Sequence, residues 1–128
     1  MDIKRLGRLA TWFTVGLFLG GFAVYARADW DTTDKALGAA AVTTLVIDWG
    51  QTRSIAKNPS QYYETNSLLG QHPSMSAVNL HFSAAILGTL LIGNYLSPSN
   101  RKIFLGTITT VEFLTVGRNN ALGIGISF

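Results

Sequence analysis

The sequence predicts an all-α protein, a small bundle of three to four transmembrane helices. The strongest observation is the run from Met75 to Leu96, twenty-two residues without Asp, Glu, Lys or Arg. About 20 mostly apolar helical residues cross the hydrocarbon core of a bilayer, whereas a globular helix of this length normally carries charge on the face that meets water. Composition agrees, because 48% of the chain is hydrophobic and only 13% is charged, against about 25% charged in ordinary soluble domains.

Charge and cysteine content exclude several classes of protein. The net charge is +3, but the basic residues stand in small groups at the ends of apolar runs. Such groups orient a membrane protein, and no basic stripe indicates nucleic acid as a partner. The absence of cysteine excludes disulfides, thiolate metal sites and a cysteine nucleophile.

Residues 1–28 form either a first transmembrane helix or a signal peptide. A basic start is followed by the apolar run Leu9 to Tyr25 and by Ala26-Arg27-Ala28, which satisfies both patterns. We expect the helix to be retained, because the run is long for a signal peptide and Gly16 and Gly20 form a GxxxG packing face. In either case the N-terminus starts in the cytoplasm, and residues 29–128 form a helical membrane domain.

The second span begins in the polar segment 29–34, where Thr33 or Asp34 is the predicted N-cap. It is apolar from Ala36 to Ile47 and then reaches the polar segment 48–53. The connection that follows, up to Ser74, contains Pro and carries basic residues that place it on the cytoplasmic side.

The third span, 75–96, ends in the turn 97–100, and a fourth apolar run begins at Ile103. That run reaches Arg118-Asn119-Asn120 before the apolar tail that ends at Phe128. Arg101 and Lys102 fall on the outer side, against the positive-inside rule, but the basic residues on the cytoplasmic side outnumber them.

A β-barrel is the alternative architecture. Ala26-Arg27-Ala28 and the alternation over 123–128 are typical of outer-membrane barrels. However, residues 75–96 do not alternate, and a mature chain of about 100 residues has little room for the minimum of about 8 strands.

Polar residues in the apolar runs are the candidate site. Asp48, Gln51 and Thr52 share a helical face, and Glu112 lies nearest to mid-span on a stripe with Thr109, Thr115 and Asn119. We favour an Asp48 that is hydrated at the headgroup level and a Glu64 that is solvated in the loop. For Glu112 we favour a structural role, in which it pairs with Arg118 or His81 or stays protonated. A functional reading remains open, in which the carboxyls share a proton or a cation. The catalytic candidates are Asp48, Glu64 and Glu112, and the wider candidate polar cluster is Asp48, Gln51, Thr52, Glu64, Asn66, Asn79, His81, Glu112, Arg118 and Asn119.

The motifs of known enzymes are absent. The two histidines do not flank a Glu as in zinc hydrolases, and no nucleophile elbow, P-loop or dinucleotide fingerprint occurs. The sequence therefore predicts neither a metal nor a cofactor.

A resemblance covers most of the chain after Trp30. Asp48-x-x-Gln51-Thr52, Glu64-x-Asn66-x-Leu68-Leu69-Gly70 and His72-Pro73-Ser74, with Asn79-Leu80-His81, resemble small bacterial and phage-encoded inner-membrane proteins. Ser67 stands where that pattern has Pro. The pattern implies a polytopic membrane protein and no particular activity.

The sequence is compatible with three functions. The first is a non-enzymatic inner-membrane protein, partner-binding or associated with the envelope or a phage, whose partners are the bilayer and a second copy or another membrane protein. The second is a membrane-embedded enzyme or a binder of lipids or other small ligands that uses the three carboxyls. The third is a holin-like lysis protein. The most specific prediction is that Asp48, Gln51, Glu64 and Asn66 line one pocket near the cytoplasmic face, with Glu112 deeper in the bundle.

Overall fold

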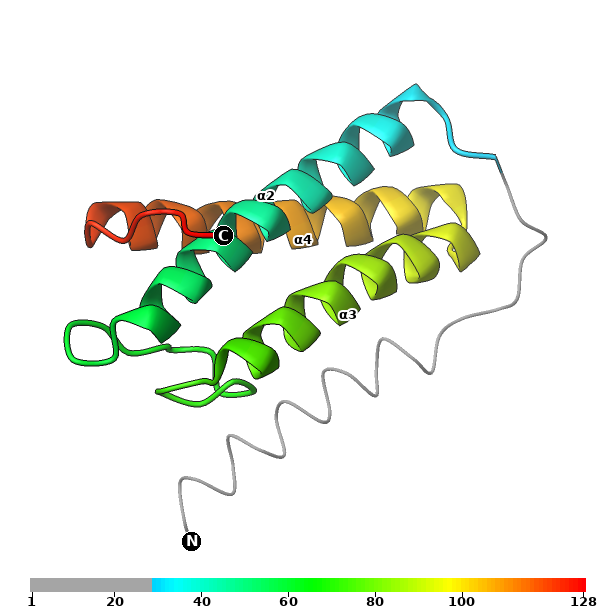
Figure 1. The fold of residues 1–128 in the computed structure, drawn as a ribbon. Coiled ribbons are helices and arrows are strands. Elements are labelled where there is room, and N and C mark those ends of the chain that lie inside the picture. The colour runs from blue at the N-terminus through cyan, green and yellow to red at the C-terminus, as the bar shows by residue number, and fades with distance from the viewer. Residues whose placement is uncertain (1–28) are drawn as a thin grey trace, which may run out of the picture.

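The computed structural model describes residues 29–128, which form three helices and no strand (Figure 1). These helices are α2 (Thr32–Lys57), α3 (Met75–Tyr95) and α4 (Pro98–Ala121). The predicted all-α class is therefore confirmed for this part of the chain. The first transmembrane helix or signal peptide predicted for 1–28 lies outside the described residues.

Helix α2 is the central element of the bundle. It crosses both other helices and packs most extensively on α4, while α3 and α4 meet each other mainly near the short turn that joins them (Figure 1). The connection 58–74 lies at the opposite end of α3. The C-terminal tail returns along α2, where the Ser127 amide donates to the Gly50 carbonyl at 3.0 Å. The bundle thus has a turn end and a loop end.

The helix ends follow from local chemistry and correct three predictions. The N-cap of α2 is Asp31, not Thr33 or Asp34, because Asp31 accepts from the Asp34 amide and Asp34 accepts from the Asp31 amide, a capping box. Helix α2 also continues to Lys57 instead of ending near Thr52. Helix α4 begins at Pro98, since proline fits the first helical turn, which lacks amide partners within the helix.

The predicted third span agrees closely with α3, which covers Met75–Tyr95 and has Leu96 as its C-cap. The Ser74 hydroxyl accepts from the Ala77 amide at 3.1 Å and caps its start. Among the described residues, α3 is the one helix long and apolar enough to cross a membrane. The transmembrane character of α2 and α4 therefore stays a prediction.

A small apolar core lies where α2 crosses α3. Leu45, Val78 and Phe82 are buried there. The Trp49 ring stacks on Phe82 with centroids 6.3 Å apart, and Phe128 from the tail meets the edge of the same indole. The aromatic contacts bring three separate segments together near the loop end.

The rest of the bundle has an unusual distribution of side chains. Charged and polar residues on α2 and α4 are buried between the helices, including Asp34, Asp48, Gln51, Arg101 and Asn119. Large apolar residues on α3 and α4 instead face outward, as for Leu87, Leu91, Phe113 and Leu114, which are 59–67% exposed. This is the reverse of the pattern expected for a helical bundle in water.

Candidate functional site

The loop end of the bundle gathers side chains from α2, α4 and the connection between α2 and α3. We call Asp48, Glu64, Glu112 and Asn119 the loop-end cluster. Asp48, Glu64 and Asn119 are all buried. The Asn119 amide donates to Asp48 Oδ1 at 3.1 Å, and the Asp48 carboxyl lies close enough to Glu112 to form a hydrogen bond and within electrostatic range of Glu64. Three carboxyl groups far apart in sequence therefore converge.

The side chains of Asp48 and Glu112 lie beside each other between α2 and α4. A carboxylate has no hydrogen to donate, so one of the two groups must carry a proton for a hydrogen bond between them to form. No N–H or hydroxyl group of residues 29–128 reaches the buried Oε2 atom of Glu112. Like charges at this distance disfavour each other, so the two carboxyl groups form a coupled acidic pair between α2 and α4.

The segment from Glu64 to Gly70 owes its shape to the residues of the resemblance motif. Glu64 Oε1 accepts from the amides of Thr65 and Asn66, both at 2.8 Å. The Asn66 side chain accepts from the Leu68 amide at 3.0 Å, forming an Asx turn. Gly70 takes φ +76°, a conformation that a β-carbon would disfavour. The motif therefore encodes a tight turn that places the Glu64 carboxyl group near α2.

The other motif residues tie this turn to the helices. Asn66 Nδ2 lies 3.2 Å from His81 Nε2 on α3, and Arg118 on α4 donates to the Thr65 hydroxyl at 3.1 Å. Asn79 Oδ1 accepts from Trp49 Nε1 and from Arg53. The Arg53 and Lys57 side chains in turn bind Ser127 in the tail.

Several predictions about this region are corrected by the structure. Asp48 is not a hydrated group at a helix end, since α2 runs nine residues further and buries it. Glu64 is not a solvated loop residue. Glu112 meets Asp48, while Arg118 binds Thr65 and His81 binds Asn66.

The remaining predicted site residues divide between two places. Gln51 is buried and its Nε2 lies 3.4 Å from the Val116 carbonyl, on the side of α2 that lines a groove of about 350 Å³ against α4 and the tail. Thr52 is also buried. Of the four residues predicted to line one pocket, Asp48 and Gln51 both contact α4, Glu64 lies within electrostatic range of Asp48, and the Asn66 side chain contacts His81. That they line one pocket stays a prediction.

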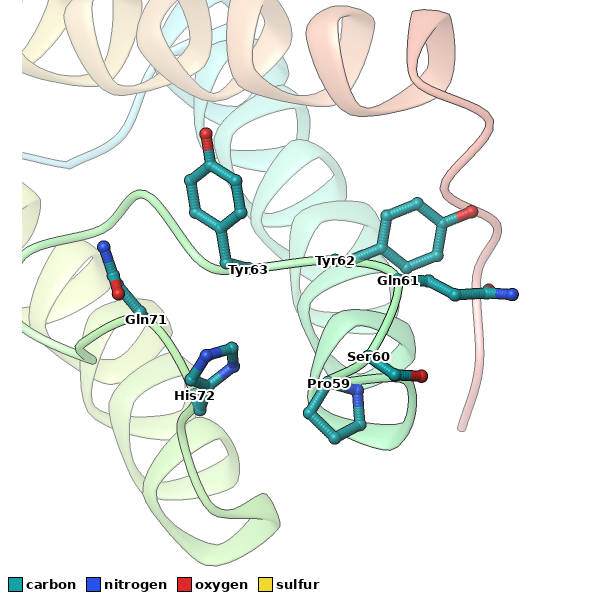
Figure 2. Close-up of a pocket in the computed structure, with 7 residues that line it drawn as sticks. All are labelled: Pro59, Ser60, Gln61, Tyr62, Tyr63, Gln71 and His72. Carbon is teal, nitrogen blue, oxygen red and sulfur yellow. The ribbon is translucent and has the colours of Figure 1, made fainter.

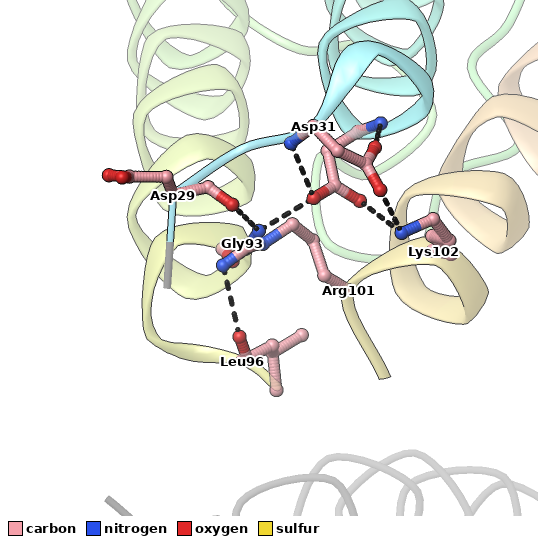
Figure 3. A network of polar contacts seen from close by, with 7 residues as sticks. Asp29, Asp31, Gly93, Leu96, Arg101 and Lys102 are labelled. Atoms are coloured by element: carbon pink, nitrogen blue, oxygen red, sulfur yellow. Dashed lines mark hydrogen bonds and ion pairs between the residues drawn. The ribbon is translucent and has the colours of Figure 1, made fainter. Parts of the chain in front are cut away.

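The turn end holds a second set of charges, which the sequence did not predict. We call Asp31, Asp34, Arg101 and Lys102 the turn-end cluster (Figure 3). Arg101 donates to Asp34 Oδ2 at 2.7 Å, and both side chains are at most 1% exposed. Arg101 Nε and Nη2 donate to the carbonyls of Gly93 and Leu96 at 2.8 and 3.2 Å, and Nη1, which binds Asp34, also donates to the Asp29 carbonyl at 3.4 Å. The guanidinium group thus joins the ends of all three helices.

Two neighbours complete the turn-end cluster. The Trp30 ring lies 5.2 Å from the Arg101 guanidinium carbon, a cation–π contact. Lys102 Nζ lies 2.8 Å from Asp31 Oδ2 and 3.1 Å from Asp34 Oδ1. The hydrogen bond from Lys102 lowers the pKa of Asp31 below its ordinary value. The signal in the sequence was two acids three residues apart at one helix start and two adjacent bases at another.

A shallow hollow of about 200 Å³ lies within the connection between α2 and α3 (Figure 2). Its lining comes from the two arms of the connection, with Pro59 and Ser60 on one and Gln71 and His72 on the other (Figure 2). No carboxylate lines it, although it adjoins Glu64, whose amide donates to the carbonyl of the lining residue Gln71 at 2.8 Å. Across residues 29–128, no three His, Asp or Glu side chains are arranged to hold a metal ion.

Comparisons with protein-family models, with curated proteins and with solved structures yield no match for this chain.

Proposed function

We propose that this protein is a small, non-enzymatic integral membrane protein whose three described helices all cross the bilayer. The observation that carries the proposal is the reversed distribution of side chains, with ion pairs and carboxyls inside and Leu, Ile and Phe outside. In water, the exposed apolar surface on α3 and α4 would drive aggregation. In lipid the same surface is favourable, and polar groups must find partners inside the bundle.

The two clusters have the properties of polar contacts that hold the helices of such a bundle together. Lipid gives no hydrophobic gain for helix association, so interhelical polar contacts and close packing hold membrane helices together. The turn-end cluster joins all three helices through Arg101, and the loop-end cluster joins α2, α4 and the connection. Three residues of the resemblance motif, Asp48, Glu64 and Asn66, make contacts at the loop end, which supports a role in assembly.

The proposed orientation places the loop end in the cytoplasm. Arg53 and Lys57 belong to the last turns of α2, and Arg118 on α4 binds Thr65 in the connection. The positive-inside rule favours basic residues on the cytoplasmic side. Three basic residues of the described chain fall on the outer side: Arg101 is fully buried, Lys102 is paired with Asp31 and Asp34, and Lys35 is exposed in the first turn of α2. The protein would then be an inner-membrane component in a bacterial host, with a membrane-protein partner or a second copy.

Membrane fractionation and cysteine labelling test this proposal. The chain has no cysteine, so single variants Gln61→Cys and Asn100→Cys report on the two ends without background. We expect the protein to stay in the pellet after alkaline carbonate washing. A membrane-impermeant maleimide should label Asn100→Cys in intact spheroplasts and Gln61→Cys only after lysis. Recovery in the soluble fraction, or labelling of both positions from outside, would refute it.

A second candidate function is supported by the convergence of three carboxyls. The loop-end cluster holds three acidic side chains and no basic one, and among residues 29–128 the side chain that donates to Asp48 is the neutral Asn119. Such a site attracts a cationic group, and an amine-bearing lipid headgroup is the cation that a bilayer supplies. Under this function phosphatidylethanolamine would raise the thermal stability of the wild type more than phosphatidylglycerol does, and Asp48→Asn would remove the difference. An equal effect of both lipids rejects it.

A further inference from the structure

One face of α3 has no partner among the described residues. Leu80, Leu87, Leu91 and Tyr95 recur at helical spacing and are 59–72% exposed. Between them lies a notch of small residues, where Ala84 is exposed and a β-carbon on Gly88 would meet no atom within 4 Å. The opposite face of α3, with Val78 and Phe82, is the one that packs on α2.

The chain enters the described structure beside this helix. The Asp29 carbonyl accepts from Arg101, which also binds the Gly93 and Leu96 carbonyls at the end of α3. The Trp30 ring then packs against Gly93. Asp29 therefore lies beside the last turn of α3, at the turn end of the bundle, and the preceding chain starts from there.

The length of the preceding chain fits the unpartnered face. The apolar run Leu9 to Tyr25 has seventeen residues, which as a helix is about 25 Å long. If it is retained and crosses the bilayer from the cytoplasm, as predicted from its basic start, it runs in the same direction as α3. It carries one GxxxG motif, Gly16 and Gly20.

The two small-residue motifs also fall at matching depths. Counting back from Asp29, Gly20 and Gly16 lie nine and thirteen residues away, or about 14 and 20 Å along a helix. Counting back from Leu96, Gly88 and Ala84 lie eight and twelve residues away, or about 12 and 18 Å. Each glycine of the run thus lies within half a helical turn of a small residue of α3.

We infer that the segment Leu9 to Tyr25 is retained and packs as a fourth helix on this face of α3, with Gly16 and Gly20 against Ala84 and Gly88. Small residues let two helix backbones approach closely, which is how parallel membrane helices with GxxxG motifs associate. The inference rests on the proposed membrane location. It makes the small-residue notch of α3 an interface within one chain instead of a surface for a second copy.

Disulfide trapping in the membrane tests this inference. The double variant Gly16→Cys/Ala84→Cys should oxidise within one chain, since helices in such contact bring α-carbons within the roughly 4.4–6.8 Å that a disulfide requires. Both thiols should then be lost to a maleimide–polyethylene glycol tag, with no dimer on a denaturing gel. The matched control is Gly16→Cys/Val111→Cys, whose second position is exposed on α4 and should keep both tags. Adding Gly88→Leu to the first pair should fill the notch and restore tagging.

Three results would overturn the inference. A disulfide-linked dimer would show that a second copy occupies the face. Two free thiols in membrane-inserted protein would show that lipid covers it. A mature protein that begins near Asp29 would show that the segment is removed. All three are read on carbonate-resistant protein, whereas failure of the proposed membrane location appears earlier, as protein in the soluble fraction.

Discussion

The ion pair between Arg101 and Asp34 provides the most direct test of the packing described here. Replacing Arg101 by Met keeps much of the side-chain volume but removes the guanidinium group and its hydrogen bonds to Asp34, Gly93 and Leu96. Breaking one partner of a buried pair costs about 3–5 kcal/mol, because the other charge stays buried. Lys102 still lies 3.1 Å from Asp34 and the pair lies at the end of the bundle, so we expect the lower figure of about 3 kcal/mol.

Such a loss is large against the total stability of a domain, about 5–15 kcal/mol. It can be measured from the unfolding of purified protein in non-ionic detergent, followed by tryptophan fluorescence and by circular dichroism. The matched control is Lys102→Met, which removes the partly exposed pair with Asp31 and a second contact to Asp34 but leaves Arg101 to balance the buried Asp34 charge. Exposed pairs contribute little, so this variant should be affected much less than Arg101→Met.

The double variant Asp34→Leu/Arg101→Met separates an ion pair from simple overpacking. Replacing both members of a buried pair by apolar residues is often neutral, so it should recover much of the stability lost in Arg101→Met. The reasoning is refuted if Arg101→Met is no less stable than Lys102→Met, or if the double variant is less stable than either single variant.

Three further predictions use the same unfolding assay. Lys102 lowers the pKa of Asp31, so the charged form of Asp31 stabilises the fold above the ordinary aspartate pKa of about 3.9, and this contribution is lost as the pH falls below that value. The difference in unfolding free energy between wild type and Asp31→Asn, which keeps an N-cap, should therefore shrink on acidification. A difference that stays constant with pH would contradict this prediction. Glu112→Gln can still donate a hydrogen bond to Asp48 and should stay within about 1 kcal/mol of wild type, whereas Glu112→Leu should lose about 1–3 kcal/mol; equal losses would argue against a hydrogen bond between these two side chains. A β-carbon on Gly38 would lie 2.6 Å from the Trp30 ring, while one on Gly106 would meet nothing within 4 Å, so Gly38→Ala should destabilise and Gly106→Ala should be neutral or raise stability by up to about 1 kcal/mol.

Much of the fold could be predicted from local sequence. The uncharged run 75–96 gave α3 almost to the residue, because a Ser N-cap before it and the Ser97-Pro98 turn after it are local signals. Helix α2 was harder to bound. Its apolar run ends at Ile47, but the helix continues for ten residues, because its last three turns are held by polar contacts to other segments.

The polar side chains of the bundle could be identified from the sequence, but their partners could not. Composition and spacing singled out Asp48, Glu64 and Glu112 as polar groups in an apolar chain, and the structure brings them together. Which partner each residue meets depends on how α2 crosses α4 and on the turn at Asn66. For that reason the sequence could not decide between Asp48, Arg118 and His81 as the partner of Glu112.

The sequence by itself determined where helices form, since apolar runs, caps and proline act over one or two turns. Only the tertiary structure decided that Arg101 and Lys102 face the acids at the start of α2, sixty-seven residues or more away. It also decided that α2 lies between the other two helices. The physical reason is that charges buried in an apolar bundle must pair with one another, and the identity of each partner depends on how the helices pack.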